Sequence, residues 1–178
     1  MGVVVVTGVP GVGKSTVMGA AEEYGYKIVN FGTTMFEEAK KDGVSNRDDM
    51  RKLAVEDQQR LQKQAGEKIS EMGNVVVDTH ASILTPSGYL PGLPEWTIRA
   101  LNPNIIVLVE ATAQEIAGRR TKDPSSARDA DDNDMHQKVY RDYAATAASI
   151  VGATVSIVEN HDDEVEIAVE QFRKVLNK

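Results

Sequence analysis

One segment of the chain combines glycines, a lysine and hydroxyl side chains at the spacing of a phosphate-binding loop. It follows the pattern G-x-x-x-x-G-K-S/T and consists of Gly8, Val9, Pro10, Gly11, Val12, Gly13, Lys14, Ser15 and Thr16. Glycines let backbone N–H groups turn toward phosphate oxygens, the lysine reaches the β- and γ-phosphates, and the hydroxyl after it can hold Mg2+. The segment therefore predicts that Lys14 contacts phosphates and that Ser15 is a magnesium ligand.

The residues around this loop supply the context that phosphate binding needs. The apolar run Val3–Val6 precedes the loop directly and predicts a buried strand, while residues 17–24 are expected to form the helix that follows. The positive end of the helix dipole then points at the bound anion. A glycine-rich turn without a ligand is the alternative, but the flanking strand and helix favour nucleotide binding.

An acidic residue at the end of another predicted strand could complete the phosphate site. Asp78 follows the apolar residues Val75–Val77, and a carboxylate in that position can orient Mg2+ and its waters beside the phosphates. An aspartate at a strand end is also a common turn former or helix cap. Its combination with Lys14 and Ser15 favours the metal role, so Ser15 and Asp78 are the expected magnesium ligands.

Arginines follow one another in the second half of the chain, at positions 119, 120, 128 and 141. A guanidinium suits bidentate contact with phosphate and can stabilise the charge that spreads over a phosphoryl group in transfer. The alternative is a pair of solvated helix faces, since aspartates between positions 123 and 134 nearly balance this charge. We expect a catalytic role for Arg119, Arg128 and Arg141 and leave Arg120 open between the two readings.

Five short apolar runs alternate with polar, helix-compatible segments along the chain. Strands that are covered on both faces are rich in Val and Ile and show little alternation, as these runs do. The pattern predicts an α/β fold in which helices flank a five-stranded parallel sheet. The runs cover residues 3–6, 27–31, 75–77, 105–109 and 155–158.

Two amphipathic helices and one long loop are expected between and after these strands. Residues 48–72 and 162–176 carry apolar side chains at helical spacing, and the first helix either covers the sheet or forms a subunit interface. Between Thr79 and Glu95, three prolines and two glycines predict a stiff loop without regular structure. Because this loop leaves the carboxyl edge of the sheet, it either contacts substrate or serves packing and oligomer contacts.

The composition narrows the classes of partner. A chain of 178 residues with 41 % hydrophobic and 26 % charged residues is typical of one globular domain. Its net charge of −7 argues against a nucleic-acid partner, and no apolar stretch approaches the roughly 20 residues of a membrane span or resembles a signal sequence. A cytoplasmic location is therefore expected. With no cysteine and three dispersed histidines, the expected metal is Mg2+ carried by the nucleotide.

Several segments together resemble the archaeal adenylate kinases over almost the whole chain. The run Gly-Tyr-Leu-Pro-Gly-Leu-Pro at 88–94, after Asp-Thr-His at 78–80, is the most specific of them. The others are the phosphate loop, Asn-Phe-Gly at 30–32 with Met-Phe at 35–36, residues 47–53, Arg119-Arg120 and Arg128-Asp129.

The resemblance implies a P-loop nucleoside monophosphate kinase fold, with residues 1–178 as a single kinase domain. Inserted in its core would be a mobile monophosphate-binding segment at residues 30–72 and a short lid at residues 120–131. The implied reaction is reversible phosphoryl transfer from MgATP to AMP, giving two ADP. The implied assembly is a homo-oligomer, often a homotrimer in these relatives.

The resemblance also implies roles for single residues in binding AMP. Phe31, Gly32 and either Thr33 or Thr34 match the start of the monophosphate-binding segment. Arg51 matches its phosphate-contacting arginine, with Arg47 as a second candidate.

Three arginines match the lid region. Arg119 corresponds to an arginine beside the ATP phosphates at the hinge of the lid, Arg128 to one that closes on transfer, and Arg141 to one that bridges toward the acceptor. The chain departs from the bacterial and eukaryotic enzymes at residues 78–80, because the arginine of their Asp-Gly-Phe-Pro-Arg motif is missing. His80 either replaces it as an acceptor contact or is structural.

Other functions share the phosphate loop and remain as alternatives. They are another nucleoside monophosphate kinase, a kinase for a small metabolite, and a nucleotide-dependent switch or assembly ATPase. A switch does not need the second arginine segment at residues 47–51 and commonly has an Asn-Lys-x-Asp motif, which is absent. No motif in the chain encodes the base of the acceptor, so AMP rests on the resemblance alone.

Overall fold

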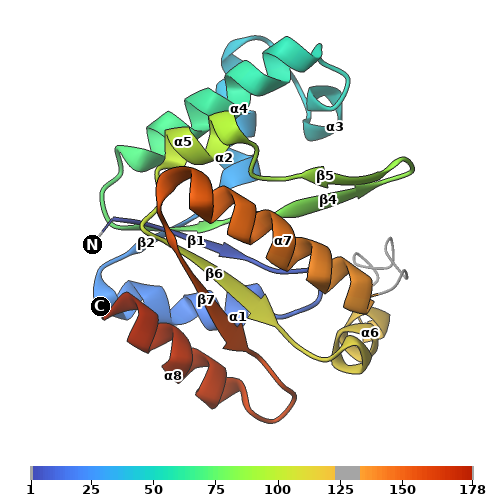
Figure 1. The fold of residues 1–178 in the computed structure, drawn as a ribbon. Helices are drawn as coiled ribbons and strands as arrows, with labels where there is room; N and C mark the ends of the chain where they lie inside the picture. The colour runs from blue at the N-terminus through green and yellow to red at the C-terminus, as the bar shows by residue number, and fades with distance from the viewer. Residues whose placement is uncertain (1, 123–132, 178) are drawn as a thin grey trace.

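A computed structural model describes residues 2–122 and 133–177, and its centre is a parallel sheet (Figure 1). The five strands have the spatial order β2-β3-β1-β6-β7. Each strand falls on one of the five predicted apolar runs, so the predicted five-stranded parallel sheet is confirmed. The strands are β1 (Val3–Thr7), β2 (Lys27–Asn30), β3 (Val75–Asp78), β6 (Ile105–Glu110) and β7 (Thr154–Glu159).

The core is built on the three inner strands, which are almost entirely excluded from solvent. Val5, Val76 and Val107 all have zero exposure, as expected for β-branched side chains covered on both faces of a parallel sheet. On one face lie α1 (Lys14–Met18) and α8 (Val165–Leu176), and on the other lie α5 (Glu95–Leu101) and α7 (Asn133–Val151) (Figure 1). The three inner strands, β3, β1 and β6, end at the edge where ligands of α/β folds bind.

The helix after the phosphate loop differs from the prediction in its bounds. The predicted helix at 17–24 begins at Lys14, inside the motif, and continues from Gly19 as a 3-10 helix, η1 (Gly19–Tyr24). The loop ends at Gly13, whose φ of 89° lies in the left-handed region that favours glycine. Lys14 and Ser15 therefore occupy the first turn of α1.

The predicted single helix at 48–72 is wrong, because the chain forms two helices there. After α2 (Phe31–Lys41) come the short α3 (Arg47–Met50) and then α4 (Val55–Ser70). The amide Nε2 of Gln58 donates to the carbonyl of Leu53 at 2.8 Å and so satisfies the backbone at the break. No proline or glycine marks this position in the sequence, and the bond depends on a side chain beyond the break.

The predicted irregular loop at 79–95 is also wrong in part, since it contains an antiparallel hairpin. Strands β4 (Ser82–Thr85) and β5 (Gly88–Pro91) pair with Ser82 opposite Pro91. Proline is tolerated on the outside of such a ribbon, where no backbone N–H is needed. At its base, a Cβ on Gly92 would lie 2.0 Å from the carbonyl oxygen of His80, so this glycine lets the hairpin return against the end of β3.

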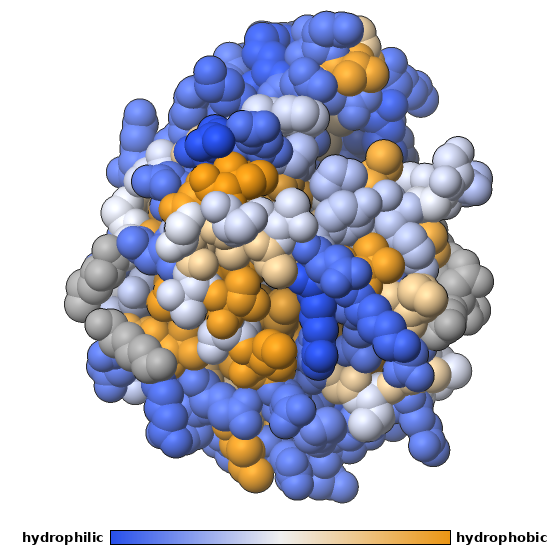
Figure 2. All heavy atoms as spheres, viewed as in Figure 1, coloured by the Kyte–Doolittle hydropathy of each residue, from blue (hydrophilic) through white to orange (hydrophobic). Residues whose placement is uncertain are grey.

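The remaining described helix is α6 (Ala113–Lys122), which follows β6 and carries Arg119 and Arg120. The predicted C-terminal helix at 162–176 is confirmed as α8, although it begins at Val165. No helix in residues 2–122 or 133–177 has the length and apolar content needed to cross a membrane. Most of the face in Figure 2 is hydrophilic, and hydrophobic side chains gather over the region of the edge strand β7, where Val155 and Ile157 are exposed.

Candidate active site

The phosphate loop forms one wall of a cavity of about 380 Å3, which we call the loop pocket. The ammonium of Lys14 lies 3.4 Å from the carbonyl oxygen of Gly8 and 3.7 Å from Oδ1 of Asp78. The phosphate loop, the end of β3 and helix α6, which lie far apart in the sequence, therefore converge at this pocket. The pocket is lined by Val9, Gly11, Val12, Gly13, Lys14, Ser15, Asp78 and Arg119.

The other residues of the motif have different places. Gly8 packs against β6, since a Cβ there would lie 2.4 Å from the carbonyl oxygen of Val109. The carbonyl of Pro10 accepts a hydrogen bond of 2.7 Å from Nε of the buried Arg120. Thr16 is exposed on α1. The reading of Arg120 as part of a solvated helix face is therefore wrong, and the structure instead shows it buried and supporting the backbone of the loop.

Arg119 lies where its predicted role requires, beside the loop. Its guanidinium donates to the carbonyl oxygens of Val12 and Asn160 at 3.2 and 2.8 Å and to the carboxylate of Asp162 at 2.7 Å. The planar guanidinium, with five donors in a fixed fork, is suited to serving several acceptors at once. Arg119 thus ties the phosphate loop to the segment after β7.

Asn160 is a site residue that the sequence analysis missed. It is buried directly after β7, and its Nδ2 donates to the carbonyl of Val12 at 2.8 Å. A Cβ on Gly13 would lie 2.3 Å from that nitrogen, so the side chain of Asn160 fits there because position 13 is a glycine. Its position at the carboxyl end of the last apolar run was the only signal in the sequence that pointed to the site.

The charges in the loop pocket are fitted to phosphate and to a hard cation. Desolvation lowers the pKa of the Lys14 ammonium, and the carboxylate of Asp78 partly opposes this effect. Oδ1 of Asp78 is buried and accepts no hydrogen bond from any described residue. A buried carboxylate oxygen that accepts no hydrogen bond, in a pocket that Ser15 also lines, belongs to a donor set that Mg2+ accepts.

A second cavity of about 350 Å3 lies beside the first, and we call it the arginine pocket. It brings together most of the residues predicted to bind AMP, from α2, α3 and the end of β3. Asp78 lines both pockets. The predicted residues in its lining are Phe31, Gly32, Arg47, Arg51 and His80.

The two threonines predicted as alternatives are placed differently. The hydroxyl of Thr33 accepts a hydrogen bond from the guanidinium of Arg47, so Thr33 holds a residue of the pocket. Thr34 is buried, and its hydroxyl donates to the carbonyl of Asn30 at 3.3 Å within α2. Thr33 is therefore the better placed of the two.

His80 lies in the arginine pocket, and its Nδ1 is 3.3 Å from the hydroxyl of Tyr140. Although the residue is exposed, desolvation of the ring and then the positive charge of Lys14 lower its pKa. The ring is therefore neutral at neutral pH, unlike the arginine of the bacterial and eukaryotic motif.

The sequence analysis did not find several other residues of the arginine pocket. Apolar and amide side chains of short helices carry no motif, and their convergence depends on how α2, α3 and α4 pack. Asn30 caps helix α2, but the sequence analysis placed it inside the predicted strand at 27–31 and not before a helix. The residues are Asn30, Met35, Met50, Gln58, Gln62 and Ile83.

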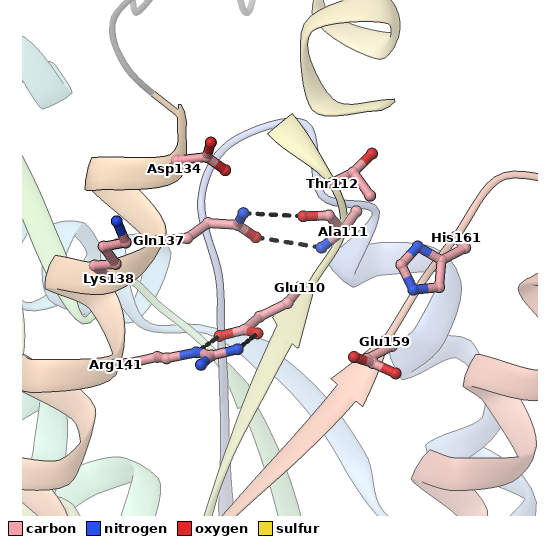
Figure 3. A pocket seen from close by; sticks show the side chains of 9 residues that line it. All are labelled: Glu110, Ala111, Thr112, Asp134, Gln137, Lys138, Arg141, Glu159 and His161. Atoms are coloured by element: carbon pink, nitrogen blue, oxygen red, sulfur yellow. Dashed lines mark hydrogen bonds and ion pairs between the residues drawn. The ribbon is translucent and has the colours of Figure 1, made fainter. Parts of the chain in front are cut away.

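Arg141 lies in a third cavity, of about 290 Å3, next to the ends of β6 and β7 (Figure 3). Its Nε and Nη2 donate to the two carboxylate oxygens of Glu110 at 2.6 and 2.5 Å. The structure therefore does not bring Arg141 together with Lys14 and Arg119, as a direct role would need. The carboxylate of Glu110, at the end of the apolar run, holds the guanidinium there.

Arg128 and most of the lid predicted at residues 120–131 lie outside the described residues. The described part of that region is residues 120–122, at the end of α6, which include Arg120.

Known proteins are similar to this chain over most of its length. The AAA domain family matches residues 7–138. The adenylate kinase of Methanocaldococcus jannaschii is 51 % identical and aligns with 98 % of this chain and 97 % of its own, and that of Thermoplasma volcanium is 49 % identical, with 97 % and 98 %.

A crystal structure of shikimate kinase from Bacteroides thetaiotaomicron aligns with 99 % of this chain and 98 % of its own, at a TM-score of 0.60 and 14 % identity. At that identity the likeness concerns the fold alone, and it confirms the predicted P-loop kinase fold. The sequence identities confirm the predicted resemblance. The chain belongs to the adenylate kinase family, and its residues 7–138 to the AAA domain family.

Proposed function

We propose that this protein catalyses the reversible transfer of the γ-phosphoryl group of ATP to AMP, giving two ADP. Its relatives are named adenylate kinases at 51 and 49 % identity over almost the full chain. The observation that carries the proposal is that the loop pocket and the arginine pocket share Asp78. A donor in one and an acceptor in the other would present their phosphates to each other, and a switch ATPase does not need the second pocket.

On the donor side, residues 8–16 hold the ATP phosphates. The backbone N–H groups of the loop surround them, and Lys14 neutralises the β- and γ-phosphates. Arg119 keeps the loop in shape and stands close enough to contact the transferring group. Transfer of this kind needs positioning and charge stabilisation and no covalent intermediate.

We propose Mg2+ as the cofactor, with Ser15 and Asp78 as its protein ligands. Oδ1 of Asp78 supports this assignment, because it is buried, accepts no hydrogen bond from the described residues and has only the ammonium of Lys14, 3.7 Å away, as an ion-pair partner. When bound with ATP, the ion would neutralise charge on the phosphates. Asp78 and Lys14 remain 3.7 Å apart, so the carboxylate also orients the ammonium toward the loop.

On the acceptor side, Arg47 and Arg51 bind the phosphate of AMP, and the segment Phe31–Thr34 shapes the pocket around the nucleoside. His80 is neutral and acts as a hydrogen-bonding group near the phosphate. It would serve as an acceptor contact in place of the arginine that the bacterial motif carries two positions later, although it lacks the positive charge of that arginine.

Residues 30–72 and 120–131 would move over the two nucleotides, and water would be excluded from the phosphoryl group. Arg128 closes on the transferring group. Arg141 leaves Glu110 and turns toward the acceptor. Because Glu110 is nearly buried and Arg141 is half exposed, the arginine is the partner that can move.

We also propose a cytoplasmic homo-oligomer, in the form of a homotrimer. Exposed apolar side chains at Ile83, Leu90, Val155 and Ile157 support an association surface. Analytical ultracentrifugation gives the number of subunits, and a single species with the mass of one chain would contradict the proposal.

The reaction is tested by incubating the protein with MgATP and AMP, GMP, CMP, UMP or water while ADP is followed. Rapid ADP formation with AMP supports the proposal. ATP loss at the same rate with every acceptor, water included, favours the switch ATPase instead.

A further inference from the structure

We infer that Gln58 and Gln62 read the base of the acceptor nucleotide and select a base with an amino group beside an unprotonated ring nitrogen. The inference rests on the proposed function and assigns the specificity of the arginine pocket. Both glutamines line that pocket. They stand four positions apart on α4, so their side chains leave the same face of the helix.

The orientation of the Gln62 carboxamide is determined by Trp96. The indole Nε1 donates to Oε1 of Gln62 at 2.6 Å. An indole N–H can only donate, so it can face only the oxygen of the amide, and the assignment of oxygen and nitrogen is not arbitrary here. The NH2 group of Gln62 is therefore the end that is left to donate to a ligand.

Close packing of two helices holds Trp96 in place. Helix α5, whose second residue is Trp96, lies against α4 (Figure 1). A Cβ on Gly66 would lie 2.7 Å from Cβ of Ala100, so the helices approach closely one turn beyond Gln62. The tryptophan and the glutamine thus come from elements with a fixed separation.

Gln58 has the opposite orientation. Its Nε2 donates to the carbonyl of Leu53 at 2.8 Å, in the break between α3 and α4. A backbone carbonyl only accepts, so the NH2 group must face it and Oε1 is left as an acceptor. Since this bond also satisfies the backbone at the break, turning the amide would leave a carbonyl unpaired.

The pair thus offers one donor and one acceptor, and this order matches adenine. The ring nitrogen N1 of adenine accepts, and its 6-amino group donates. Hypoxanthine and guanine carry N1–H and O6 instead. The NH2 group of Gln62 would then face another donor, and Oε1 of Gln58 would face another acceptor. Cytosine has the same order as adenine, but its single ring covers less of the apolar side chains of Met35, Met50 and Ile83 in the pocket.

The sharpest probe is IMP, which differs from AMP only at this edge of the base. The wild-type protein is expected to use AMP with a kcat/KM at least about 100-fold above that for IMP, because a mismatched polar edge leaves buried groups unpaired. Gln62→Glu still accepts from Trp96 but has no donor for N1. For this variant, the ratio of kcat/KM with AMP to kcat/KM with IMP should fall by at least about tenfold.

Two further variants separate base reading from a structural effect. Gln64→Glu makes the same change at an exposed position of α4 and should keep the wild-type ratio. Trp96→Phe removes the donor that fixes Gln62, so the amide can turn and the ratio should fall as well. A loss of folded protein lowers the rates with AMP and IMP equally and leaves the ratio unchanged.

Titration calorimetry with AMP and IMP in the absence of ATP gives the same ratio from binding alone, so failure of the proposed reaction and failure of base reading are distinguishable. The inference is overturned if wild-type protein binds IMP as tightly as AMP. It is also overturned if Gln62→Glu and Gln64→Glu share the wild-type ratio.

Discussion

The side-chain amide of Asn30 donates from Nδ2 to Oδ2 of Asp78 at 3.0 Å, while its Oδ1 accepts from the backbone N–H of Thr33 at 3.0 Å. Asn30 is thus the N-cap of α2 and also a partner of the carboxylate that lines both pockets. Asn30 therefore links Asp78, the proposed metal ligand, to α2, a helix whose first residues line the arginine pocket.

The change Asn30→Asp should separate these two roles. It keeps an acceptor for the N–H of Thr33, so the helix cap remains and the free energy of unfolding should change by no more than about 1 kcal/mol. It also places a second carboxylate against Asp78, and we expect kcat to fall by about 10- to 100-fold. Steady-state kinetics and urea unfolding measure the two effects.

The matched control is Asn46→Asp. Asn46 caps α3 in the same way, with Oδ1 accepting from the N–H of Asp49 at 3.0 Å, and its amide also faces the carboxylate of Asp49. If both variants lose turnover equally, the link from Asn30 to Asp78 has no part in the reaction.

Arg51→Ala should weaken the acceptor and spare the donor. Arg51 lines the arginine pocket, and loss of a charge-assisted contact with phosphate is expected to raise KM for AMP by about tenfold or more. KM for ATP should stay within about twofold. Arg60→Ala is the control, because Arg60 forms surface ion pairs with Asp42 and Asp57. An equal rise of KM for ATP and AMP in Arg51→Ala would contradict the assignment.

The sheet could be predicted from sequence because buried parallel strands need continuous apolar runs, and Val3–Val6 and Ile105–Val109 are of that kind. The hairpin could not, since Pro86 and Pro91 weaken the strand signal although they occupy its turn and its last position. The helix break before Val55 depends on a hydrogen bond from Gln58, so the amphipathic pattern continues across it.

The candidate site divides in a similar way. Lys14 and Ser15 could be found because they belong to a motif of fixed spacing, and Asp78 because it ends an apolar run. Asn160 and Gln62 act through partners 148 and 34 positions away, and no local pattern encodes such distances. Arg141 was predicted from its charge and from the resemblance, and the sequence does not reveal that Glu110 holds it in another cavity.

Arg141→Ala should lower both stability and turnover, for different reasons. It leaves the nearly buried carboxylate of Glu110 unpaired, which costs about 1–3 kcal/mol of unfolding free energy. Adding Glu110→Gln removes that charge and should restore part of the stability. If Arg141 takes part in transfer, the double variant remains slow, whereas Glu110→Gln alone stays active. Recovery of turnover together with stability would limit Arg141 to a structural role.

The pair of His161 and Glu115 should make stability depend on pH. Nδ1 of His161 lies 3.1 Å from the carboxylate of Glu115, and this hydrogen bond raises the pKa of the histidine. The pKa of Glu115 is lowered, chiefly by the backbone N–H of Asp162, so Glu115 stays charged near neutral pH. Because folding raises the pKa of His161, the pair stabilises the folded protein fully at pH values below the pKa of an unfolded histidine, about 6.5. This stabilisation is lost as the pH rises through the pKa of His161 in the folded protein.

Thermal unfolding of wild-type protein and of His161→Gln measures this contribution. The wild-type Tm should exceed that of the variant by more at about pH 5.5 than at about pH 8.5. His80, whose pKa is lowered, gives the opposite trend but is present in both proteins and cancels. A difference that is constant with pH, or larger at high pH, would show that the pair does not titrate as described.

The central claim is that the phosphoryl group passes from one pocket to the other and not to water. Its most direct test is to count the products when the protein consumes MgATP in the presence of AMP. We predict two ADP for each ATP consumed, with no inorganic phosphate, and no loss of ATP when AMP is omitted. Release of inorganic phosphate at the same rate with and without AMP would contradict the account.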